Sequence, residues 1–380
     1  MELPPLSLYV HLPWCVRKCP YCDFNSHEAR DGLPEGEYVA ALLRDLDAER
    51  PQAHGRIVES VFVGGGTPSL FYGAAIAALV DGIRARVQLR GGAEITLEAN
   101  PGAVEASRFA AYRAAGVNRL SIGVQSFRDA QLRALGRVHG AQEAARAVAL
   151  ARAAGFANVN VDLMYGLPGD DAEGALADLE AAAALEPAHI SWYELTLEPN
   201  TAFHRRPPPR LPAEDTVIEI EERGRALLAR AGYERYEVSA YARAGYRCAH
   251  NLNYWLFGDY IGIGAGAHGK ITVPGEGRIV RRTKPRNPRT YVHSAGTAAG
   301  VGIERVDSGA ELLLEFLMNA LRLPEGVGIA QYTARTGQGL AAIERPLGEA
   351  VRRGWLAPEP GVLKPTPAGL QALNAVLALF

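Results

Sequence analysis

The stretch Tyr9–Phe24 reads YVHLPWCVRKCPYCDF, and in it a short apolar run leads into three cysteines with the spacing CxxxCxxC. Thiolates are the natural ligands of iron–sulfur clusters. Cys15, Cys19 and Cys22 lie on one loop, so they can bind three irons of a [4Fe–4S] cluster and leave the fourth iron open. An open iron can chelate a small ligand through an amine and a carboxylate. The spacing therefore predicts a cluster that binds a second, small cofactor.

A structural zinc site is the alternative for this loop, with His11 or His27 as its fourth ligand. The next motif favours the cluster. The sequence GGGTPS at residues 64–69 ends the second apolar run, and consecutive glycines let a ligand approach the backbone and its N–H donors. A glycine-rich turn at the carboxyl end of the strand that follows the cysteine loop lies where barrel sites form.

Composition is that of an ordinary globular protein. Of the 380 residues, 48% are hydrophobic and 22% are charged, and the net charge of −2 gives no general attraction to nucleic acid or anionic membranes. The N-terminus shows no secretory signal, and no apolar run is long enough to span a membrane. Three of the four cysteines are clustered rather than spread as a disulfide framework. We therefore expect a cytoplasmic protein in a reducing compartment.

Residues 1–200 alternate short apolar runs with amphipathic helical stretches, which predicts an α/β fold with a parallel sheet and right-handed crossovers. Six such units are too few for a closed barrel of eight, so we expect an open, partial (β/α)6 barrel. The expected strands are Ser7–Trp14, Ser60–Gly64, Glu94–Asn100, Asn118–Val124, Asn158–Tyr165 and Ile190–Leu197. The expected helices are Glu37–Glu49, Ala74–Val87, Glu105–Ala115, Ala141–Ala154 and Asp171–Leu185.

The pattern changes after Pro199, and we divide the rest into a barrel extension at residues 201–305 and a smaller C-terminal domain at residues 306–380. The extension is expected to contain a Pro-rich loop, a helix, a strand and an irregular connection, at His204–Pro212, Glu214–Ala231, Tyr236–Tyr241 and Lys270–Thr290. The C-terminal domain is expected to be helical and winged-helix-like, with helices at Glu311–Leu321, Ile329–Thr336, Ile343–Arg353 and Thr366–Leu379 and a hairpin at Trp355–Lys364. Its basic surface is weak, which favours a lid or partner-docking role over DNA binding.

Polar side chains stand at or just after the ends of three successive expected strands. Glu98, Gln125 and Asp162 belong to these ends, and Arg137 follows in the sequence LGRVH. Together they would place two acids, an amide and a guanidinium around one mouth of the barrel. A zwitterionic cofactor with ribose hydroxyls needs such donors and acceptors.

With these motifs the chain resembles, over nearly its whole length, the coproporphyrinogen dehydrogenase-like group of radical S-adenosylmethionine proteins. The resemblance implies that Cys15, Cys19 and Cys22 bind the [4Fe–4S] cluster. It also implies that S-adenosylmethionine is bound by three sets of residues: Tyr9, Gly65, Gly66 and Thr67 at its methionine portion; Glu98, Gln125, Arg137 and Asp162 along the pocket; and Gly264, Ala265, Gly266 and Ala267, from IGIGAGAHG, near its adenosine.

Two departures separate the chain from the true dehydrogenases of that group. Those resemble CxxxCxxCxC, whereas the position two after Cys22 is Phe24. They also carry a long extension before the first strand, whereas only a few residues precede Ser7. Both departures match the HemW heme chaperones. The element HNLNYW at His250–Trp255 also matches, because HNxxYW is associated with heme binding in that family.

The resemblance implies a heme chaperone that passes heme to acceptor proteins such as respiratory enzymes. Histidine is a common axial ligand of heme iron, so His250 is the candidate ligand, and Tyr254 and Trp255 offer aromatic area to a porphyrin face. Cys248 could also bind heme iron, although a buried spectator thiol is favoured. A homodimer controlled by the cluster and peripheral membrane contact through the acceptors are further expectations. The rival function is oxygen-independent oxidation of coproporphyrinogen III.

A basic segment near the end of the barrel extension has two interpretations. The segment at residues 278–289 carries six cations, Arg278, Arg281, Arg282, Lys284, Arg286 and Arg289. These cations could pair with heme propionates. A solvated, charged loop is the favoured interpretation.

Overall fold

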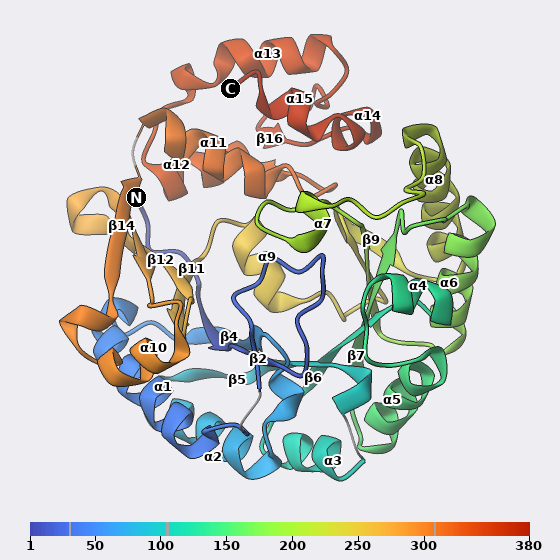
Figure 1. The fold of residues 1–380 in the computed structure, drawn as a ribbon. Helices are drawn as coiled ribbons and strands as arrows, with labels where there is room; N and C mark the ends of the chain where they lie inside the picture. The colour runs from blue at the N-terminus through green and yellow to red at the C-terminus, as the bar shows by residue number, and fades with distance from the viewer. Residues whose placement is uncertain (30–31, 104–105, 308) are drawn as a thin grey trace.

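The computed structural model describes residues 1–29, 32–103, 106–307 and 309–380. Within them, six parallel strands follow one another in chain order across the middle of a single sheet (Figure 1). These strands are β1 (Leu6–Leu12), β4 (Val58–Gly65), β5 (Leu89–Ala99), β6 (Arg119–Gln125), β7 (Asn158–Tyr165) and β8 (His189–Glu194). Each coincides with one of the expected runs to within a few residues, so the expected α/β partial barrel is confirmed.

Helices follow the outside of the strands (Figure 1). They are α1 (Glu35–Glu49), α2 (Gly73–Arg84), α3 (Ala106–Ala114), α5 (Ala141–Ala153), α6 (Ala172–Ala184) and α8 (Glu214–Arg230), with a short α4 (Asp129–Ala134) after β6. The expected start of the third helix, Glu105, lies outside the described residues. Alternation along the strands sets the two faces: Leu6, Leu8 and Val10 are buried against the helices, while the residues between them face the inside of the barrel.

The second half of the chain extends both edges of this sheet, which corrects two expectations. Residues 236–241 are not one strand but parts of β9 (Glu234–Glu237) and β10 (Ala240–Ala242), a pair that joins the edge at β8. Residues 270–290 are not irregular. They hold most of β12 (His268–Val273), all of β13 (Arg278–Thr283) and the start of α10 (Pro288–Ser294). With β11 (Asp259–Ile263) and β14 (Gly302–Asp307), β12 and β13 continue the sheet from β1.

Local charge explains the error at β13, because four cations in its neighbourhood hid a strand whose charges are paired with carboxylates elsewhere in the fold. Lys284 is buried with Nζ 2.5 Å from Asp45 and 2.6 Å from Glu49 on α1. The Pro-rich stretch is a smaller correction, since His204 and Arg205 end the short helix α7 (Ala202–Arg205).

The C-terminal domain packs around its own apolar core, which includes Leu312, Phe316 and Tyr332. Its main helices are α11 (Gly309–Ala320), α12 (Ile329–Thr336) and α13 (Glu344–Arg352), close to the expected bounds. The expected last helix is two short ones, α14 (Pro367–Gln371) and α15 (Leu373–Leu377). The expected hairpin is also corrected: Leu356 bridges Pro365, but β16 (Val362–Leu363) pairs with β15 (Val327–Gly328).

A short helix, α9 (Ala249–Trp255), lies inside the circle formed by the strands and their outer helices, and it connects the barrel with the C-terminal domain (Figure 1). The side chains of Leu252 and Trp255 pack on the C-terminal core, and the Arg322 guanidinium lies 4.3 Å from the centre of the Trp255 ring. The division of the chain at residues 201 and 306 stays a prediction. Within the described ranges, no helix has the length and apolar character needed to cross a membrane.

Candidate functional site

The cysteine loop leaves the carboxyl end of β1 and returns through a small parallel pair, β2 (Trp14–Cys15) and β3 (His27–Glu28). Cys15, Cys19 and Cys22 are half-buried free thiols. Burial raises the pKa of Cys15, and it raises that of Cys22 to about 11. The Cys15 and Cys22 thiols therefore stay protonated at neutral pH unless a cation binds, and metal binding would release their protons.

Two polar side chains reach the cysteine sulfurs, Thr67 from the segment after β4 and Arg137 from the segment after α4. The Thr67 hydroxyl donates to Cys15 Sγ at 3.5 Å. The Arg137 guanidinium donates to Cys19 Sγ at 3.8 Å and to the Gly123 carbonyl at 2.6 Å. Hydrogen bonds to the sulfurs are among the features that tune iron–sulfur clusters, so the residues present fit a cluster held on this loop.

The donor set suits a cluster better than a single zinc ion. In the part of the chain that the structure describes, no three His, Cys, Asp or Glu side chains converge as ligands of one ion. Three cysteines of a [4Fe–4S] cluster bind three different irons, so they need not converge. His11, a candidate fourth zinc ligand, uses both ring nitrogens: Nε2 donates to the Asn25 carbonyl at 2.8 Å and Nδ1 accepts from Tyr9 at 3.0 Å.

The glycine run at the end of β4 serves packing as well as binding. Gly65 has φ of 115°, and a Cβ there would lie 2.6 Å from the His11 ring. A Cβ on Gly66 would lie 2.5 Å from the Trp14 carbonyl oxygen. The Gly66 and Thr67 amides donate to backbone carbonyls on the β1 side, so these amides are not open donors, contrary to expectation. Only glycine lets β1 and β4 approach this closely.

Two carboxyl groups lie inside the barrel near the glycine run. Glu98 Oε2 accepts from the Gly65 amide at 3.1 Å. Burial, with a smaller contribution from Asp162, raises the pKa of Glu98 to about 7. Burial also raises the pKa of Asp162, which accepts hydrogen bonds from Ser121 and Asn160. Carboxyl groups with raised pKa values mark candidate binding sites.

Gln125 completes this side of the barrel. It has a left-handed φ of 71° at a register shift between β6 and β7, and its Oε1 accepts from the Tyr193 hydroxyl at 2.8 Å. A non-glycine residue in this conformation is strained, which is common at ligand sites.

A cavity of about 530 Å³ opens between the cysteine loop, β1 and α9. This volume is in the range of small-molecule sites. Four of the residues expected to bind S-adenosylmethionine line it, namely Tyr9, Gly65, Glu98 and Gly266. Tyr254 of the HNxxYW element also lines it. So do His11, the alternative zinc ligand, and Arg286 of the basic segment, together with five residues for which no ligand was expected: Asp23, Phe24, Asn25, Tyr260 and His268.

The remaining expected residues lie around the cavity rather than on its surface. Thr67 and Arg137 contact the cysteines, and Gln125 and Asp162 lie on β6 and β7. Ala265 and Ala267 are buried. The Gly264 and Ala265 amides donate to the hydroxyls of Tyr291 and Tyr38 at 3.0 and 2.8 Å. This segment therefore shapes the cavity through its backbone.

His250 lies beneath the cavity and is 1% exposed. Its Nδ1 hydrogen-bonds Ser60 Oγ and its Nε2 hydrogen-bonds the Tyr254 hydroxyl, both at 3.0 Å. Burial lowers its pKa to about 3, so the imidazole is neutral. Cys248 is also buried, and its Sγ lies 3.4 Å from Glu94.

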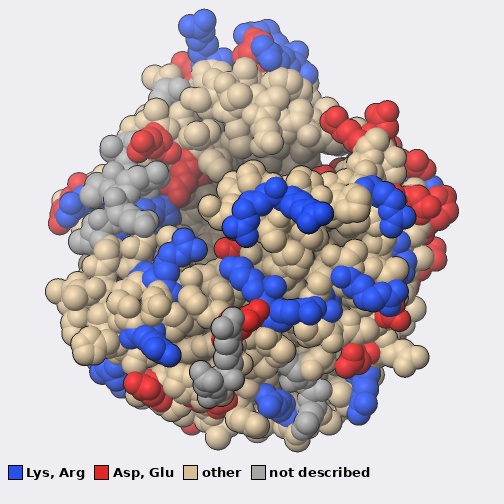
Figure 2. Space-filling view, viewed as in Figure 1, with Lys and Arg blue, Asp and Glu red and all other residues tan. Residues whose placement is uncertain are grey.

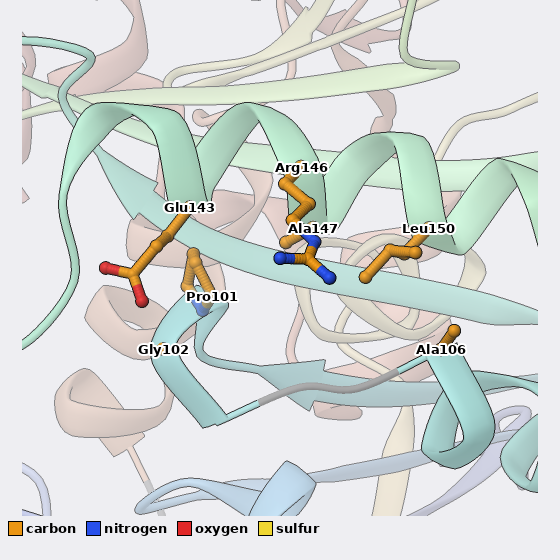
Figure 3. A pocket seen from close by; sticks show the side chains of 7 residues that line it. All are labelled: Pro101, Gly102, Ala106, Glu143, Arg146, Ala147 and Leu150. Carbon is orange, nitrogen blue, oxygen red and sulfur yellow. The ribbon is translucent and has the colours of Figure 1, made fainter.

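A second, smaller hollow of about 220 Å³ lies between α5 and the segment after β5, lined by Pro101, Gly102, Ala106, Glu143, Arg146, Ala147 and Leu150 (Figure 3). It contains none of the expected ligands and no aromatic side chain. The larger cavity is therefore the candidate site.

Comparison with known proteins shows which family the chain belongs to. Residues 9–182 match the radical SAM superfamily model and residues 307–372 match the HemN C-terminal domain model. The chain is 52% identical to the heme chaperone HemW of Escherichia coli over 100% of this chain and 99% of the relative. The chain belongs to the HemW family. It is also 46% identical to the Haemophilus influenzae HemW, over 100% and 98% of the two chains.

A solved structure shows the same fold. It is described as coproporphyrinogen III oxidase (HemN) from Escherichia coli, a radical SAM enzyme. The two structures superpose with a TM-score of 0.82 at 23% identity, over 99% of this chain and 90% of that one. At this identity the likeness concerns the fold alone.

Proposed function

We propose that this protein is a heme chaperone that binds heme next to a [4Fe–4S] cluster with S-adenosylmethionine and delivers the heme to acceptor hemoproteins. One observation carries the proposal: Tyr254 of the HNxxYW element lines the same cavity as Tyr9, Gly65 and Glu98. Heme and the cofactor would therefore meet in one site.

The cofactor side of the proposal assigns a role to each side chain. Cys15, Cys19 and Cys22 hold the cluster, whose open iron supplies a chelation site for the amine and carboxylate of S-adenosylmethionine. Glu98 and the Tyr9 ring line the part of the cavity where S-adenosylmethionine would lie. Thr67 and Arg137 orient the sulfurs through their hydrogen bonds.

The heme side assigns axial ligation to His250. A neutral imidazole can bind iron, and burial keeps His250 neutral. Both ring nitrogens are engaged in the structure, so ligation requires Nε2 to give up its hydrogen bond to Tyr254. Heme entry would thus displace the Tyr254 hydroxyl from the imidazole.

Because the protein would deliver heme, its partners would be the proteins that accept it. Acceptors would be heme-requiring proteins such as respiratory enzymes, reached in the cytoplasm or at the membrane surface where such acceptors lie. A reducing compartment keeps the three thiols available as ligands. The cluster with its cofactor would control transfer or the formation of a homodimer.

The test combines three measurements on anaerobically reconstituted protein. Heme is titrated and followed by its Soret band, for the native chain and for His250→Ala. The loaded protein is then mixed with an apo-hemoprotein, and transfer is followed by the acceptor's spectrum. Coproporphyrinogen III is supplied separately with reductant, S-adenosylmethionine and an electron acceptor, and protoporphyrinogen IX is quantified.

Stoichiometric heme binding, an altered Soret band in His250→Ala, transfer to the acceptor and no protoporphyrinogen IX support the chaperone. Sustained protoporphyrinogen IX formation that is lost in Cys19→Ala would replace it with the dehydrogenase. Absence of heme binding by protein with an intact cluster spectrum would reject heme delivery.

A further inference from the structure

Most cations of the basic segment at residues 278–289 are already paired. Arg278 pairs with Glu276 and Arg281 with Glu315, while Arg282 and Lys284 pair with carboxylates of α1. Arg286 and Arg289 are exposed, and neither forms an ion pair with the part of the chain that the structure describes. Of these two, Arg286 lines the cavity.

The backbone fixes Arg286 at the cavity mouth next to the cysteine loop. Its carbonyl accepts from Asn25 Nδ2 at 2.8 Å and from His27 Nε2 at 3.3 Å. Asn25 Nδ2 also donates to the Ala265 carbonyl at 2.9 Å. Three segments far apart in the sequence thus meet at one amide, and Arg286 lines the same cavity as Phe24.

Aromatic side chains line the same cavity as this cation. Phe24 is 56% exposed and lines the cavity, although a large apolar side chain on a loop gains nothing from water. Tyr254 and Tyr260 lie deeper, with ring centroids 4.6 Å apart in an edge-on arrangement. We call Phe24, Tyr254, Tyr260 and Arg286 the aromatic wall. It presents rings and one cation, and the carboxylate of Asp23 lies at the same mouth.

Other exposed cations near the cysteine loop do not line the cavity. Figure 2 shows Lys and Arg side chains gathered over the cysteine loop and α7, where Arg17, Lys18, Arg205 and Arg206 are exposed. Arg17 donates to the Gly136 carbonyl and Lys18 to the Phe24 carbonyl. None of the four lines the cavity. Arg286 is therefore the cation that a ligand in the cavity would meet.

We propose that Arg286 binds a propionate carboxylate of the porphyrin while Phe24, Tyr254 and Tyr260 pack against its ring. This inference rests on the proposed function and names the side chain that would hold the porphyrin's carboxylate. A planar guanidinium matches a carboxylate in two hydrogen bonds, and aromatic rings suit a flat apolar macrocycle. The pairing would orient the porphyrin with a carboxylate edge toward the cavity mouth.

The test uses two ligands that differ only at the carboxylates, iron(III) protoporphyrin IX and its dimethyl ester, in the same detergent-containing buffer. Each is titrated by absorbance into the native protein, Arg286→Gln and Arg289→Gln. Arg289 is the matched control because it is exposed on the same segment but does not line the cavity. The affinity of each variant for S-adenosylmethionine is measured by calorimetry in parallel.

We expect Arg286→Gln to weaken heme binding about fivefold to tenfold and to leave the dimethyl ester unchanged, while Arg289→Gln changes neither. Phe24→Ser should weaken both ligands alike. Equal loss for heme and ester in Arg286→Gln would overturn the carboxylate contact. Loss of S-adenosylmethionine binding with unchanged heme affinity would instead assign Arg286 to the cofactor. Failure of the native protein to bind either porphyrin would reject the proposed function itself.

Discussion

The cavity has two walls that the chain builds in different ways. The cofactor wall, Tyr9, Gly65 and Glu98, comes from the neighbouring parallel strands β1, β4 and β5. The aromatic wall gathers Phe24, Tyr254, Tyr260 and Arg286 from the cysteine loop, α9, β11 and the segment after β13. The first is polar, acidic and set by the sheet. The second is aromatic and cationic, and depends on side-chain contacts between distant segments.

This difference suggests that the walls can be damaged separately. Parallel strands position the cofactor wall whether or not heme is present. Tyr254 of the aromatic wall instead depends on α9, whose neighbouring Trp255 packs on the C-terminal core. Heme affinity should therefore respond to changes that leave the cluster intact, and the reverse should also hold.

Removal of a cluster ligand should have the largest effect of the variants that test whether the two walls are independent. Cys19→Ala should lose nearly all bound iron, because two remaining thiolates cannot hold the cluster. Heme affinity should fall much less than the iron content, because Tyr254, Tyr260 and Arg286 of the aromatic wall lie on other segments and only Phe24 belongs to the cysteine loop. Iron analysis and the Soret titration measure the two outcomes.

Cys248→Ala is the matched control for Cys19→Ala. Its thiol is buried beside Glu94, so the variant should keep its iron. If heme affinity falls together with iron in Cys19→Ala, the two walls form one unit and the comparison fails.

Tyr254→Ala tests the aromatic wall. Loss of the ring should weaken heme binding about tenfold and leave iron content unchanged. Tyr254→Phe keeps the ring but frees His250 Nε2 from its hydrogen bond. If His250 binds heme iron, Tyr254→Phe should bind heme as tightly as the native protein or more tightly. Weakening by the same factor in both variants would contradict the assigned role of the ring.

The sequence predicted the two walls unequally, for a physical reason. Apolar residues that face the helices, such as Leu8 and Val10, revealed the strands, and the motifs at the strand ends revealed Gly65 and Glu98. Local pattern could not place Arg286, because its position depends on hydrogen bonds from Asn25 and His27, more than 250 residues away.

The same reason explains the missed strand. β13 is charged, and its partners on α1 are distant in sequence. The sequence marks His11 only as a candidate zinc ligand, although the period of two in β1 places it on the same face as Tyr9.

Glu98 gives a smaller effect, on stability. Its pKa is raised from 4.5 to about 7, so the folded protein binds an extra proton between these pH values and loses stability as pH rises through that range. Glu98→Gln removes this loss and keeps an acceptor for the Gly65 amide. Urea unfolding of the cofactor-free protein should show the variant more stable by about 1 to 3 kcal/mol at pH 8 and by much less at pH 5. A pH-independent difference would show that Glu98 does not titrate there.

The smallest effect is expected at Thr67, whose hydroxyl donates to Cys15 Sγ. A hydrogen bond to a thiolate stabilises the reduced, more negative cluster, so Thr67→Val should lower the reduction potential. A bond of about 1 kcal/mol corresponds to about 40 mV for one electron. Redox titration without S-adenosylmethionine measures the shift, with Thr67→Ser as the control that keeps the hydroxyl. Heme affinity should not change in either variant, because the hydroxyl faces the cysteine and not the aromatic wall. A shift in heme affinity without a shift in potential would contradict the contact with Cys15 as the role of Thr67.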